Sequence, residues 1–333
     1  MRHQYKGFIP QNTAPTSAAK IGVYDAGGRR RGSIPLGNLK KQLGEKRFSF
    51  GLVSDIHVNA DRTETSAHFD NALTLFEERG CAFCAHAGDM TNIGFWCNQG
   101  DTEIYLGQFG EYKRICDLHP ELPVYGICGN HDSYNKVITE NLAELQAYTG
   151  NGLYFAIEHG GDLFIFIGEP ASYGAMNDEE FAWFKNLLES NPGRRCHVFT
   201  HYYVANDSGS TKNCYTCAFG SREAEFKAIM ASHGRAIHYH GHSHIKFQCQ
   251  ELDEATNFTV KNGFPSVHVP SVAESRNVVQ LADGTWTRVA EELCSQGYIV
   301  DVYDDCIVLN GLDLITGLSI PHGTFEINIA PGY

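Results

Sequence analysis

From Phe48 onward, the sequence alternates short apolar runs with amphipathic stretches, and this alternation restricts the possible folds more than any other feature. The runs FSFGLVSDIH, CAFCAHAGD and LPVYGICGNHD each predict a buried strand that ends in polar residues. The stretches that follow them, such as SAHFDNALTLFEERG, place apolar residues at helical spacing. Strands separated by helices pair in parallel and bury both sheet faces, so we expect an α/β fold.

The second half of the chain continues this pattern and then changes it. The run LYFAIEHGGDLFIFIGE predicts a hairpin with Gly160 and Gly161 at its turn. The segment 264–333 predicts antiparallel strands without helices. Between them we expect the strands CHVFTHYY and AIHYHGHSH and the helices DEEFAWFKNLLES and REAEFKAIMASHG.

The first 47 residues differ from the rest of the chain. The stretch KIGVYDAGGRRRGSIPL predicts two short strands around an Ala-Gly-Gly turn, with its basic residues on a solvated face. We therefore predict an N-terminal extension over residues 1–47 that contains a β-hairpin, and a single domain over residues 48–333. No signal-peptide stretch and no run long enough for a membrane helix occurs, which predicts a cytoplasmic protein without a membrane partner.

The charge balance of the chain is acidic. The sequence has 26 Lys and Arg residues against 39 Asp and Glu residues, a formal net charge of −13. This balance disfavours general binding to phosphate backbones, so we expect no stable nucleic-acid binding. A local positive site is compatible with it, because distant charges are screened at physiological salt. The sequence does not indicate the oligomeric state.

The sequence contains 11 cysteines, and we expect free thiols rather than a disulfide framework. Cys81 and Cys84 are predicted to be packing thiols, because positions three apart on a strand face opposite sides and cannot bind one ion together. Cys214 and Cys217 fall in a predicted loop, where they would hold a metal or form a disulfide. A structural zinc needs two further ligands, so the role of this pair stays open.

The predicted strands of the α/β region end in side chains that bind metals. Because ligands bind at the carboxyl ends of strands in open α/β sheets, these side chains should meet at one rim. A glycine directly precedes Asp89, Asn130 and His242, where a bulkier residue would crowd the backbone against an ion. The five strand ends carry Asp55 and His57; Asp89; Asn130, His131 and Asp132; His201; and His242 and His244.

The types and spacing of these side chains indicate the class of ion. In Asp55-x-His57 and His242-x-His244 the members of each pair are two residues apart, so on an extended chain both would point the same way. Carboxylate, imidazole and amide ligands without a thiolate suit Mn, Fe, Zn or Ni. The prediction of a metal centre depends on the whole set, since a lone DxH occurs often by chance.

Taken in order, DxH, GD, GNHD, H and GHxH resemble the signature of the calcineurin-like metallophosphoesterase superfamily, over about residues 50–245. The resemblance implies a four-layer α/β/β/α sandwich of two mixed sheets, with two divalent metal ions at the rim. Mn is the favoured metal. The resemblance assigns Asp55, His57 and His244 to one ion, Asn130, His201 and His242 to the other, and Asp89 to a bridge between them.

The same resemblance implies a metal-dependent hydrolase of small-molecule phosphate esters. Two divalent ions lower the pKa of bound water toward about 7, so a metal-bridging hydroxide would be the nucleophile. His131 resembles the family's histidine that contacts the phosphate, and an imidazole of near-neutral pKa can protonate the leaving oxygen. Asp132 would orient that ring, with a turn or helix cap as the alternative.

The sequence leaves the substrate class open. It does not separate a phosphatase from a phosphodiesterase, including a cyclic-nucleotide diesterase, and a catalytically inactive metal-binding scaffold is a further alternative. Asn92 stands where purple acid phosphatases carry a tyrosine ligand, so we expect no tyrosinate–iron chromophore. Phe95, Trp96 and Tyr202 would either stack on an organic leaving group or pack in the core. The histidines within predicted strands are expected to be buried groups of the core: His86, His197, His238 and His240.

Overall fold

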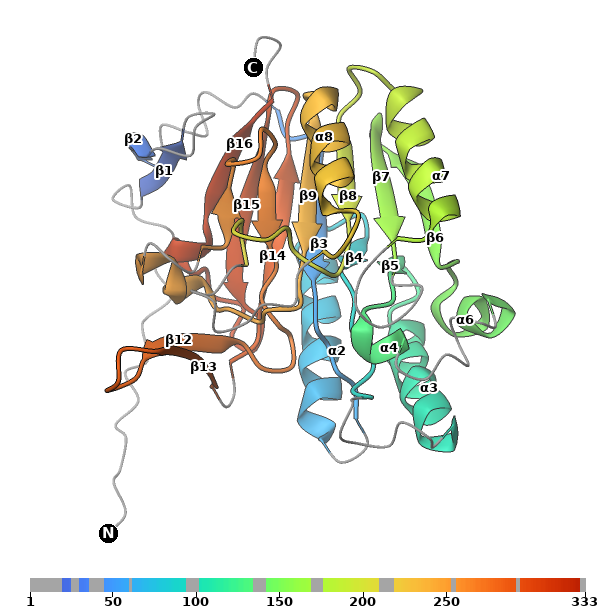
Figure 1. The fold of residues 1–333 in the computed structure, drawn as a ribbon. Helices are drawn as coiled ribbons and strands as arrows, with labels where there is room; N and C mark the ends of the chain where they lie inside the picture. Colours follow the sequence, from blue (N-terminus) through green and yellow to red (C-terminus); the bar gives the residue numbers. More distant parts are fainter. Residues whose placement is uncertain are drawn as a thin grey trace.

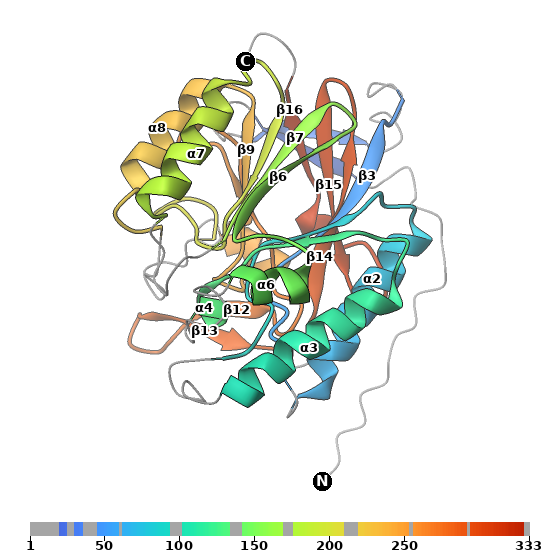
Figure 2. The same cartoon turned by 90° about the vertical axis from the view of Figure 1, so that its right-hand side faces the viewer.

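Two mixed β-sheets stack face to face between two layers of helices in this computed structural model (Figure 1). Helices α7 (Asp178–Glu189) and α8 (Glu223–His233) cover one outer side, and α2 (Thr63–Glu78) and α3 (Thr102–Leu118) cover the other (Figure 2). The arrangement confirms the predicted four-layer α/β/β/α sandwich. The structure describes residues 20–24, 30–35, 45–59, 62–93, 102–133, 142–168, 176–209, 219–252, 256–291 and 294–329.

The first sheet has the strand order β2-β1-β16-β15-β14-β3-β4-β5. Its parallel part, β3-β4-β5, comes from the predicted strand–helix–strand units, and β14 joins it by antiparallel pairing with β3. The strands are β1 (Lys20–Tyr24), β2 (Arg30–Pro35), β3 (Phe48–Val53), β4 (Cys84–His86), β5 (Val124–Gly126), β14 (Gln296–Val302), β15 (Cys306–Asp313) and β16 (Phe325–Asn328).

The second sheet has the order β10-β11-β9-β8-β7-β6. Strands β6 and β7 form the predicted hairpin, and Gly160 and Gly161 at its turn both have positive φ, 55° and 88°. Strand β11 was expected to be antiparallel but pairs in parallel with β9, which adds one more strand end to the rim. The strands are β6 (Tyr154–His159), β7 (Asp162–Ile167), β8 (Cys196–Phe199), β9 (Ala236–His240), β10 (Phe258–Thr259) and β11 (Ser266–His268).

The remaining elements are short. Strands β12 (Arg276–Gln280) and β13 (Trp286–Ala290) form a separate antiparallel pair. The helix α4 (Asn130–Ser133) follows β5 directly, and α6 (Leu142–Thr149) follows it in the chain. Two 3₁₀ turns lie in the last third of the chain, η1 (Phe247–Leu252) and η2 (Pro321–Gly323).

Three apolar cores between the layers hold the sandwich together. Strand β7 illustrates them, because its residues alternate between two cores: Phe164 and Phe166 face the other sheet, whereas Ile165 packs toward α7 and α8. The third core lies between the first sheet and the helices α2 and α3, and includes Phe76 and Phe109. Both faces of each sheet are therefore apolar, which is why the strands read as continuous apolar runs.

The N-terminal segment forms part of the first sheet. Strands β1 and β2 form the expected antiparallel pair, and β1 also pairs in parallel with β16, so the hairpin is the edge of the first sheet. The division of the chain at residue 47 stays a prediction.

Cys81 and Cys84 are buried, free thiols as expected, but Cys81 precedes β4 and both lie in the same core, so the argument from opposite strand faces was wrong.

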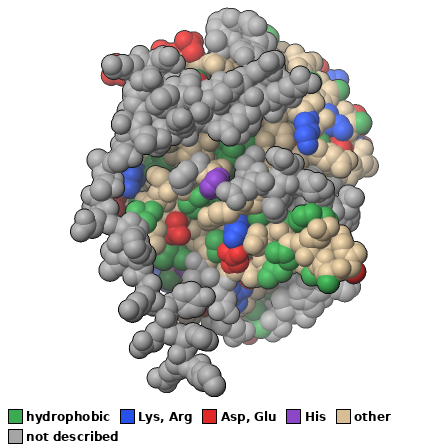
Figure 3. Space-filling view, turned by 90° about the vertical axis from the view of Figure 1, so that its left-hand side faces the viewer, with side chains coloured by type: hydrophobic (Ala, Val, Ile, Leu, Met, Phe, Trp, Pro, Cys, Tyr) green, Lys and Arg blue, Asp and Glu red, His purple; other side chains and the backbone are tan. Residues whose placement is uncertain are grey.

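Two observations concern the charge of one face and the length of the helices. On the face in Figure 3, the described basic and acidic side chains are scattered singly or in mixed groups rather than gathered in one basic patch. No helix among the described residues combines the length and the apolar character of a membrane span.

Candidate metal centre

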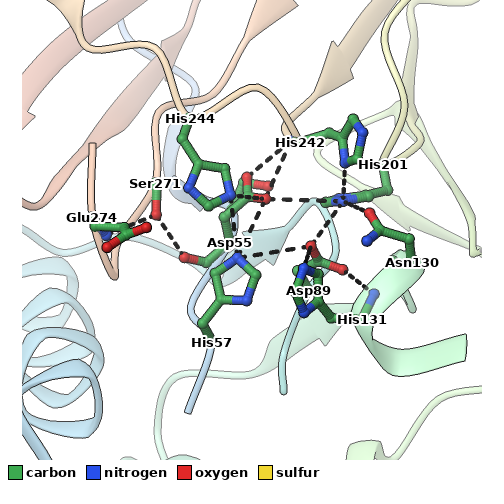
Figure 4. A network of polar contacts seen from close by, with 12 residues as sticks. Asp55, His57, Asp89, Asn130, His131, His201, His242, His244, Ser271 and Glu274 are labelled. Atoms are coloured by element: carbon green, nitrogen blue, oxygen red, sulfur yellow. Dashed lines mark hydrogen bonds and ion pairs between the residues drawn. The ribbon is translucent and has the colours of Figure 1, made fainter. Parts of the chain in front are cut away.

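The ends of strands β3, β4, β8 and β9 and the start of α4 meet at one rim (Figure 4). All seven predicted ligand side chains point into this place, and each residue is nearly or completely buried. Acidic and imidazole side chains that are close enough to share an ion form three groups among the described residues. Two of these groups have no residue in common, and the third, His57, Asp89 and His131, overlaps both. The first two groups are Asp55, His57 and His244, and Asp89, His201 and His242.

The first group surrounds one carboxylate oxygen of Asp55. His244 Nε2 lies 3.0 Å from Asp55 Oδ1, and His57 Nε2 lies 3.2 Å from His244 Nε2. The other nitrogen of His57, Nδ1, is 3.2 Å from the carbonyl oxygen of Thr91. A hydrogen bond of Nδ1–H to that carbonyl leaves Nε2 as the free ligand atom, which is the usual arrangement around a metal-binding histidine.

The second group surrounds His201. Its Nε2 atom lies 3.1 Å from Asp89 Oδ2, 3.1 Å from Asn130 Oδ1 and 3.2 Å from His242 Nδ1. Its Nδ1 atom lies 2.9 Å from the carbonyl oxygen of Ala87, so this ring is oriented in the same way as His57. Two imidazoles, one carboxylate and one amide oxygen therefore converge on one point.

Asp89 connects the two groups. Its Oδ2 atom lies 3.1 Å from His201 Nε2 and 3.7 Å from His57 Nε2. The other oxygen, Oδ1, accepts a hydrogen bond of 2.9 Å from the backbone N–H of His131. One carboxylate thus reaches both groups, while its second oxygen is held by the start of α4.

The backbone at the rim is unusual. Among the described residues, six that are not glycine have positive φ, and five of these are candidate ligands. We expected Asp55-x-His57 and His242-x-His244 to be extended, and that was wrong, because a left-handed turn at each ligand aims the side chains instead. Left-handed backbone costs an L-residue roughly 1–2 kcal/mol. The five ligands are Asp55 (53°), His57 (49°), Asp89 (59°), His242 (71°) and His244 (59°).

The glycines that precede three ligands leave room for neighbouring ligands. A Cβ atom on Gly241 would lie 2.4 Å from Asp55 Oδ2, and one on Gly129 would lie 2.3 Å from Asp89 Oδ1. A Cβ atom on Gly88 would lie 2.5 Å from His201 Nδ1. The sequence prediction was that these glycines let the backbone approach an ion; the structure adds that they let the ligands approach one another.

Electrostatics at the rim favour cations. Burial opposes ionisation of Asp55, but His244 and His201 hold its pKa well below the usual value. Burial also opposes protonation of His201, but Asp89 and Asp55 raise its pKa to about 10. Burial, together with neighbouring imidazoles, lowers the pKa of His57 and His242 well below the usual range. Burial likewise opposes ionisation of Asp89, but His201 and His131 hold its pKa well below the usual value. The two carboxylates are thus ionised, the rings of His57 and His242 are neutral, and His201 holds a proton whose place a cation can take.

A model of the family described as "calcineurin-like phosphoesterase" matches residues 48–246. The chain belongs to this family. The structure resembles a dimetal phosphatase from Danio rerio, with a TM-score of 0.57 and 14% identity, over 86% of this chain and 100% of that one. It also resembles GAP50, "the anchor in the inner membrane complex of Plasmodium", with a TM-score of 0.53 and 10% identity, over 85% of this chain and 89% of that one. A comparison with curated protein sequences gives no match.

In this calcineurin-like phosphoesterase, His131 lies next to both groups. Its Nε2 atom is 4.0 Å from Asp89 Oδ2, and its ring meets the ring of His57 edge to face at 4.6 Å. Its side chain is 22% exposed, whereas those of His57 and Asp89 are 6% and 1% exposed. Burial lowers its pKa. His131 is therefore an imidazole at the open side of the centre.

The carboxylate of Asp132 holds two loops together. It accepts hydrogen bonds from the backbone N–H groups of Met90 (3.0 Å), Thr91 (2.8 Å) and Gly129 (2.8 Å), and from the hydroxyl of Thr91 (2.9 Å). These contacts tie the loop after β4 to the loop before α4. They favour the capping alternative for Asp132, and its orientation of the His131 ring stays a prediction.

The sequence analysis missed the segment that follows β11. Ser271 Oγ donates to the carbonyl oxygen of Asp55 at 2.9 Å, and the backbone N–H of Ala273 donates to the same oxygen at 3.1 Å. These two contacts support the left-handed turn at Asp55. The run SVHVPSVAES contains a strand followed by proline, which was the available signal, but its parallel pairing with β9 depends on tertiary contacts.

The other predicted residues lie around the centre or outside the described part. Tyr202 is buried against the ring of His242, with centroids 4.4 Å apart, which supports the packing alternative. The strand histidines are buried as expected: His86, His197, His238 and His240. Four residues with predictions fall outside the described residues: Phe95, Trp96, Cys214 and Cys217.

Proposed function

We propose that this phosphoesterase is a two-metal hydrolase in which Asp89 bridges two divalent ions. The position of Asp89 between the two groups carries this proposal, since one carboxylate oxygen reaches a histidine of each group. The donor set of carboxylate, imidazole and amide atoms suits Mn, Fe, Zn or Ni, and we favour Mn. One ion would be held by Asp55, His57 and His244, and the other by Asn130, His201 and His242.

Bound ions would polarise a phosphoryl oxygen and supply a hydroxide nucleophile at neutral pH. The chain supports that chemistry in two ways. The carbonyl oxygens of Thr91 and Ala87 accept from His57 and His201, which fixes the tautomers that present Nε2. The loops after β4 and before α4 are clamped by Asp132, so Asp89 keeps its position between the groups.

We propose that His131 protonates the leaving oxygen of the substrate. It is the exposed histidine of the centre, it lies 4.0 Å from Asp89 Oδ2, and its pKa is lowered by burial. A group at this place can reach an ester oxygen, whereas the completely buried rings of His201 and His242 face the ligands. General acids of this kind contribute about 10²–10⁴-fold to turnover.

The substrate would be a small phosphate ester, and monoester or diester specificity is not part of the proposal. A phosphodiesterase and an inactive scaffold remain the alternatives to a phosphatase. The complete ligand set, together with His131, weighs against an inactive scaffold. We also propose no stable binding of nucleic acid, which the acidic charge of the chain supports. A cytoplasmic location stays a proposal from the sequence.

The proposal is tested by metal analysis and a substrate panel. Purified protein should contain two divalent ions per chain, and added Mn should allow turnover of an aryl phosphate. An aryl monoester, a bis-aryl ester and an aryl phosphonate ester then separate a phosphatase from a phosphodiesterase. Absence of bound metal, or of turnover for every ester in the panel, would contradict the proposed function.

The role of His131 is tested by His131→Ala. This variant should keep both ions and lose roughly 10²–10⁴-fold in kcat. Because the lost group is a proton donor, the loss should be smaller for an ester whose leaving group is already a good anion, such as 4-nitrophenol. Unchanged kcat with normal metal content would show that another group protonates the leaving oxygen.

A further inference from the structure

Three arginines gather beside the His244 side of the metal centre. Arg288 Nη1 donates to the carbonyl oxygen of Ser243 at 2.7 Å, and the backbone N–H of Arg276 donates to the carbonyl oxygen of His244 at 2.6 Å. Arg62 lies just before α2, and the helix is tied to the ligand loop because Thr65 Oγ1 donates to the carbonyl oxygen of His57 at 3.1 Å. Such a group is unexpected in a chain of net charge −13.

Glu274 joins two of these arginines. Its Oε1 atom lies 2.6 Å from Arg276 Nη2, and its Oε2 atom lies 3.3 Å from Arg62 Nη1. The backbone N–H of Glu274 donates at 3.0 Å to Ser271 Oγ, the hydroxyl that holds the carbonyl oxygen of Asp55. Figure 4 places Glu274 on the side of His244, away from Asn130. The arginines are thus positioned by the same segment that supports the metal centre.

Arg62 and Arg276 have more N–H donors than their carboxylate partners use. A guanidinium has five N–H donors. Arg276 gives Nη2 to Glu274, and Arg62 gives Nη1 to Glu274 and Nε to Glu64, so each guanidinium has further N–H groups. The side chains of Arg62, Arg276 and Glu274 are 39%, 29% and 22% exposed, so the place is sheltered but open to solvent. Guanidinium forks bind phosphate and carboxylate groups in pairs of hydrogen bonds.

The local charge also favours an anion. Among the described residues, the ion pairs of Arg62 and Arg276 are with two carboxylates, Glu274 and Glu64, and Glu64 is the more exposed of the two, at 47% against 22%. Neighbouring arginines, with His244, hold the pKa of Glu274 below its usual value against burial, so it stays ionised. An incoming anion would therefore compete with Glu274 for the guanidinium groups rather than meet free arginines.

We propose that Arg62 and Arg276 bind a second anionic group of the substrate, a phosphate or a carboxylate, while the ester phosphate lies at the metal centre. This inference rests on the proposed function and adds the substrate class to it: doubly anionic phosphate esters are preferred over singly anionic ones. Glu274 holds the two guanidinium groups in place when no substrate is bound and yields them to the second anion.

The test compares ligands that differ only in the second anion. Propylphosphonic acid and propane-1,3-diyl bisphosphonic acid have no cleavable ester, so calorimetry with the Mn-loaded protein measures binding without turnover. The bisphosphonate should bind at least about tenfold more tightly, the size expected of one charge-assisted hydrogen-bonded pair. Bisphosphonates with two and four carbons cover other spacings, and 3-phosphonopropionic acid tests a carboxylate as the second anion.

Variants decide which residues cause the preference. The preference is measured by the dissociation constant of propylphosphonic acid divided by that of propane-1,3-diyl bisphosphonic acid. Arg276→Gln should lower this ratio to near one. Glu274→Gln should raise it, because the carboxylate that competes with the ligand is gone. Arg222→Gln is the matched control: Arg222 also pairs with two carboxylates, Asp178 and Glu225, but stands at the start of α8. It should leave the ratio unchanged.

Three results would overturn the inference. The first is that neither a bisphosphonate nor 3-phosphonopropionic acid binds more tightly than propylphosphonic acid. The second is a preference that remains in Arg276→Gln, and the third is a preference that is lost in Glu274→Gln. The last would mean that Glu274 itself contacts the ligand as an acceptor. Turnover of propyl phosphate and propane-1,3-diyl bisphosphate separates this inference from the proposed function. Turnover of both at equal kcat/KM would contradict the second-anion site alone, whereas failure of every ester in the substrate panel would contradict hydrolysis.

Discussion

Two buried clusters of charged side chains lie at opposite ends of the strands, and they satisfy their carboxylates differently. Asp162, at the start of β7, lies 2.6 Å from Arg195 Nε and 3.2 Å from His197 Nε2, and Arg47 lies 3.3 Å away. At the rim, Asp55 and Asp89 meet imidazoles and backbone N–H groups. The first cluster has its own permanent cations; the second does not.

This difference separates a structural cluster from a metal centre. Burial opposes ionisation of Asp162, but His197 and Arg195 lower its pKa to about 2, and an arginine keeps its charge at every physiological pH. Unlike arginine, an imidazole can give up its proton to become a metal ligand, and burial already keeps the pKa of His57 and His242 low, so metal ions can bind there. A buried carboxylate paired with arginine indicates stability, and one surrounded by converging imidazoles indicates metal binding.

The largest expected effect comes from removing the bridge. Asp89→Asn takes away the carboxylate that we propose as the bridge between the two ions, so at least one ion should be lost. Mutation of a residue that hydrogen-bonds to a metal ligand typically lowers metal affinity or activity about 10–100-fold. Loss of a bridging ligand should therefore lower kcat/KM by at least about 100-fold. Metal analysis and aryl phosphate turnover measure the two effects. Asp162→Asn is the control, and a similar loss of metal in that variant would end the distinction between the clusters.

The next effect concerns the arginine cluster. Arg195→Met leaves Asp162 without its nearest cation in a place where their side chains are 4% and 2% exposed, and breaking a buried pair typically costs about 3–5 kcal/mol. Urea unfolding should show this loss while the metal content per folded chain stays the same. Arg194→Met is the matched control, because Arg194 pairs with the exposed Glu158 and should cost less than about 1 kcal/mol. Equal losses of unfolding free energy in the two variants would contradict the view that the Asp162 cluster stabilises the fold.

Removal of metal should destabilise the protein through the rim. Ions that bind only the folded chain add about 2.7 kcal/mol at a concentration 100 times their Kd, so chelation should lower the free energy of unfolding by that order. The Arg195→Met variant should lose the same amount, because its change lies at the other end of the strands. An unfolding free energy that does not change on chelation, measured in wild type, would contradict binding at the rim.

The smallest effect tests whether histidine next to carboxylates is enough to bind metal. His119 lies 2.9 Å from Glu77 and 2.8 Å from Asp70, but through opposite ring nitrogens, so the three do not converge. Burial opposes its protonation, yet the two carboxylates raise its pKa. Its ion pairs therefore stabilise below the unfolded pKa of about 6.5, and this contribution is lost as pH rises through the folded pKa.

His119→Gln should accordingly destabilise more at pH 6 than at pH 9, by less than about 1 kcal/mol because the pairs are near solvent. Urea unfolding at the two pH values measures the difference. Added Mn should change neither value for the variant relative to wild type. A Mn-dependent difference would show that carboxylates on opposite sides of one imidazole ring also bind metal. Convergence of the side chains on one point would then not be needed for metal binding.

Local patterns in the sequence predict the α/β class and the polar strand ends, and the resemblance to the family adds the four-layer sandwich and the assignment of candidate ligands. Apolar runs such as FSFGLVSDIH show a buried strand and its polar end, and the order of the ends places the polar residues at one rim. All seven predicted ligands meet there. Their backbone conformation was not predictable in the same way, since positive φ at Asp55 or His244 is imposed by tertiary hydrogen bonds rather than by residue type.

Contacts between distant segments account for the other differences. The parallel pairing of β11 with β9 brings Ser271 to the carbonyl oxygen of Asp55, 216 residues away in the chain. Asp132 gives its oxygens to N–H groups of a loop about 40 residues earlier, as the separations of 41 and 42 show. Such pairings leave no periodicity in the sequence, so the supporting residues were missed although the candidate ligands were predicted.

The positive φ angles of the five candidate ligands lower the folding stability of the protein. Glycine adopts left-handed backbone without this cost, but it would also remove buried hydrogen bonds such as those that Asp55 and Asp89 accept from backbone N–H groups. The strain at these five residues is therefore concentrated where ions would bind, and not in the apolar cores between the layers.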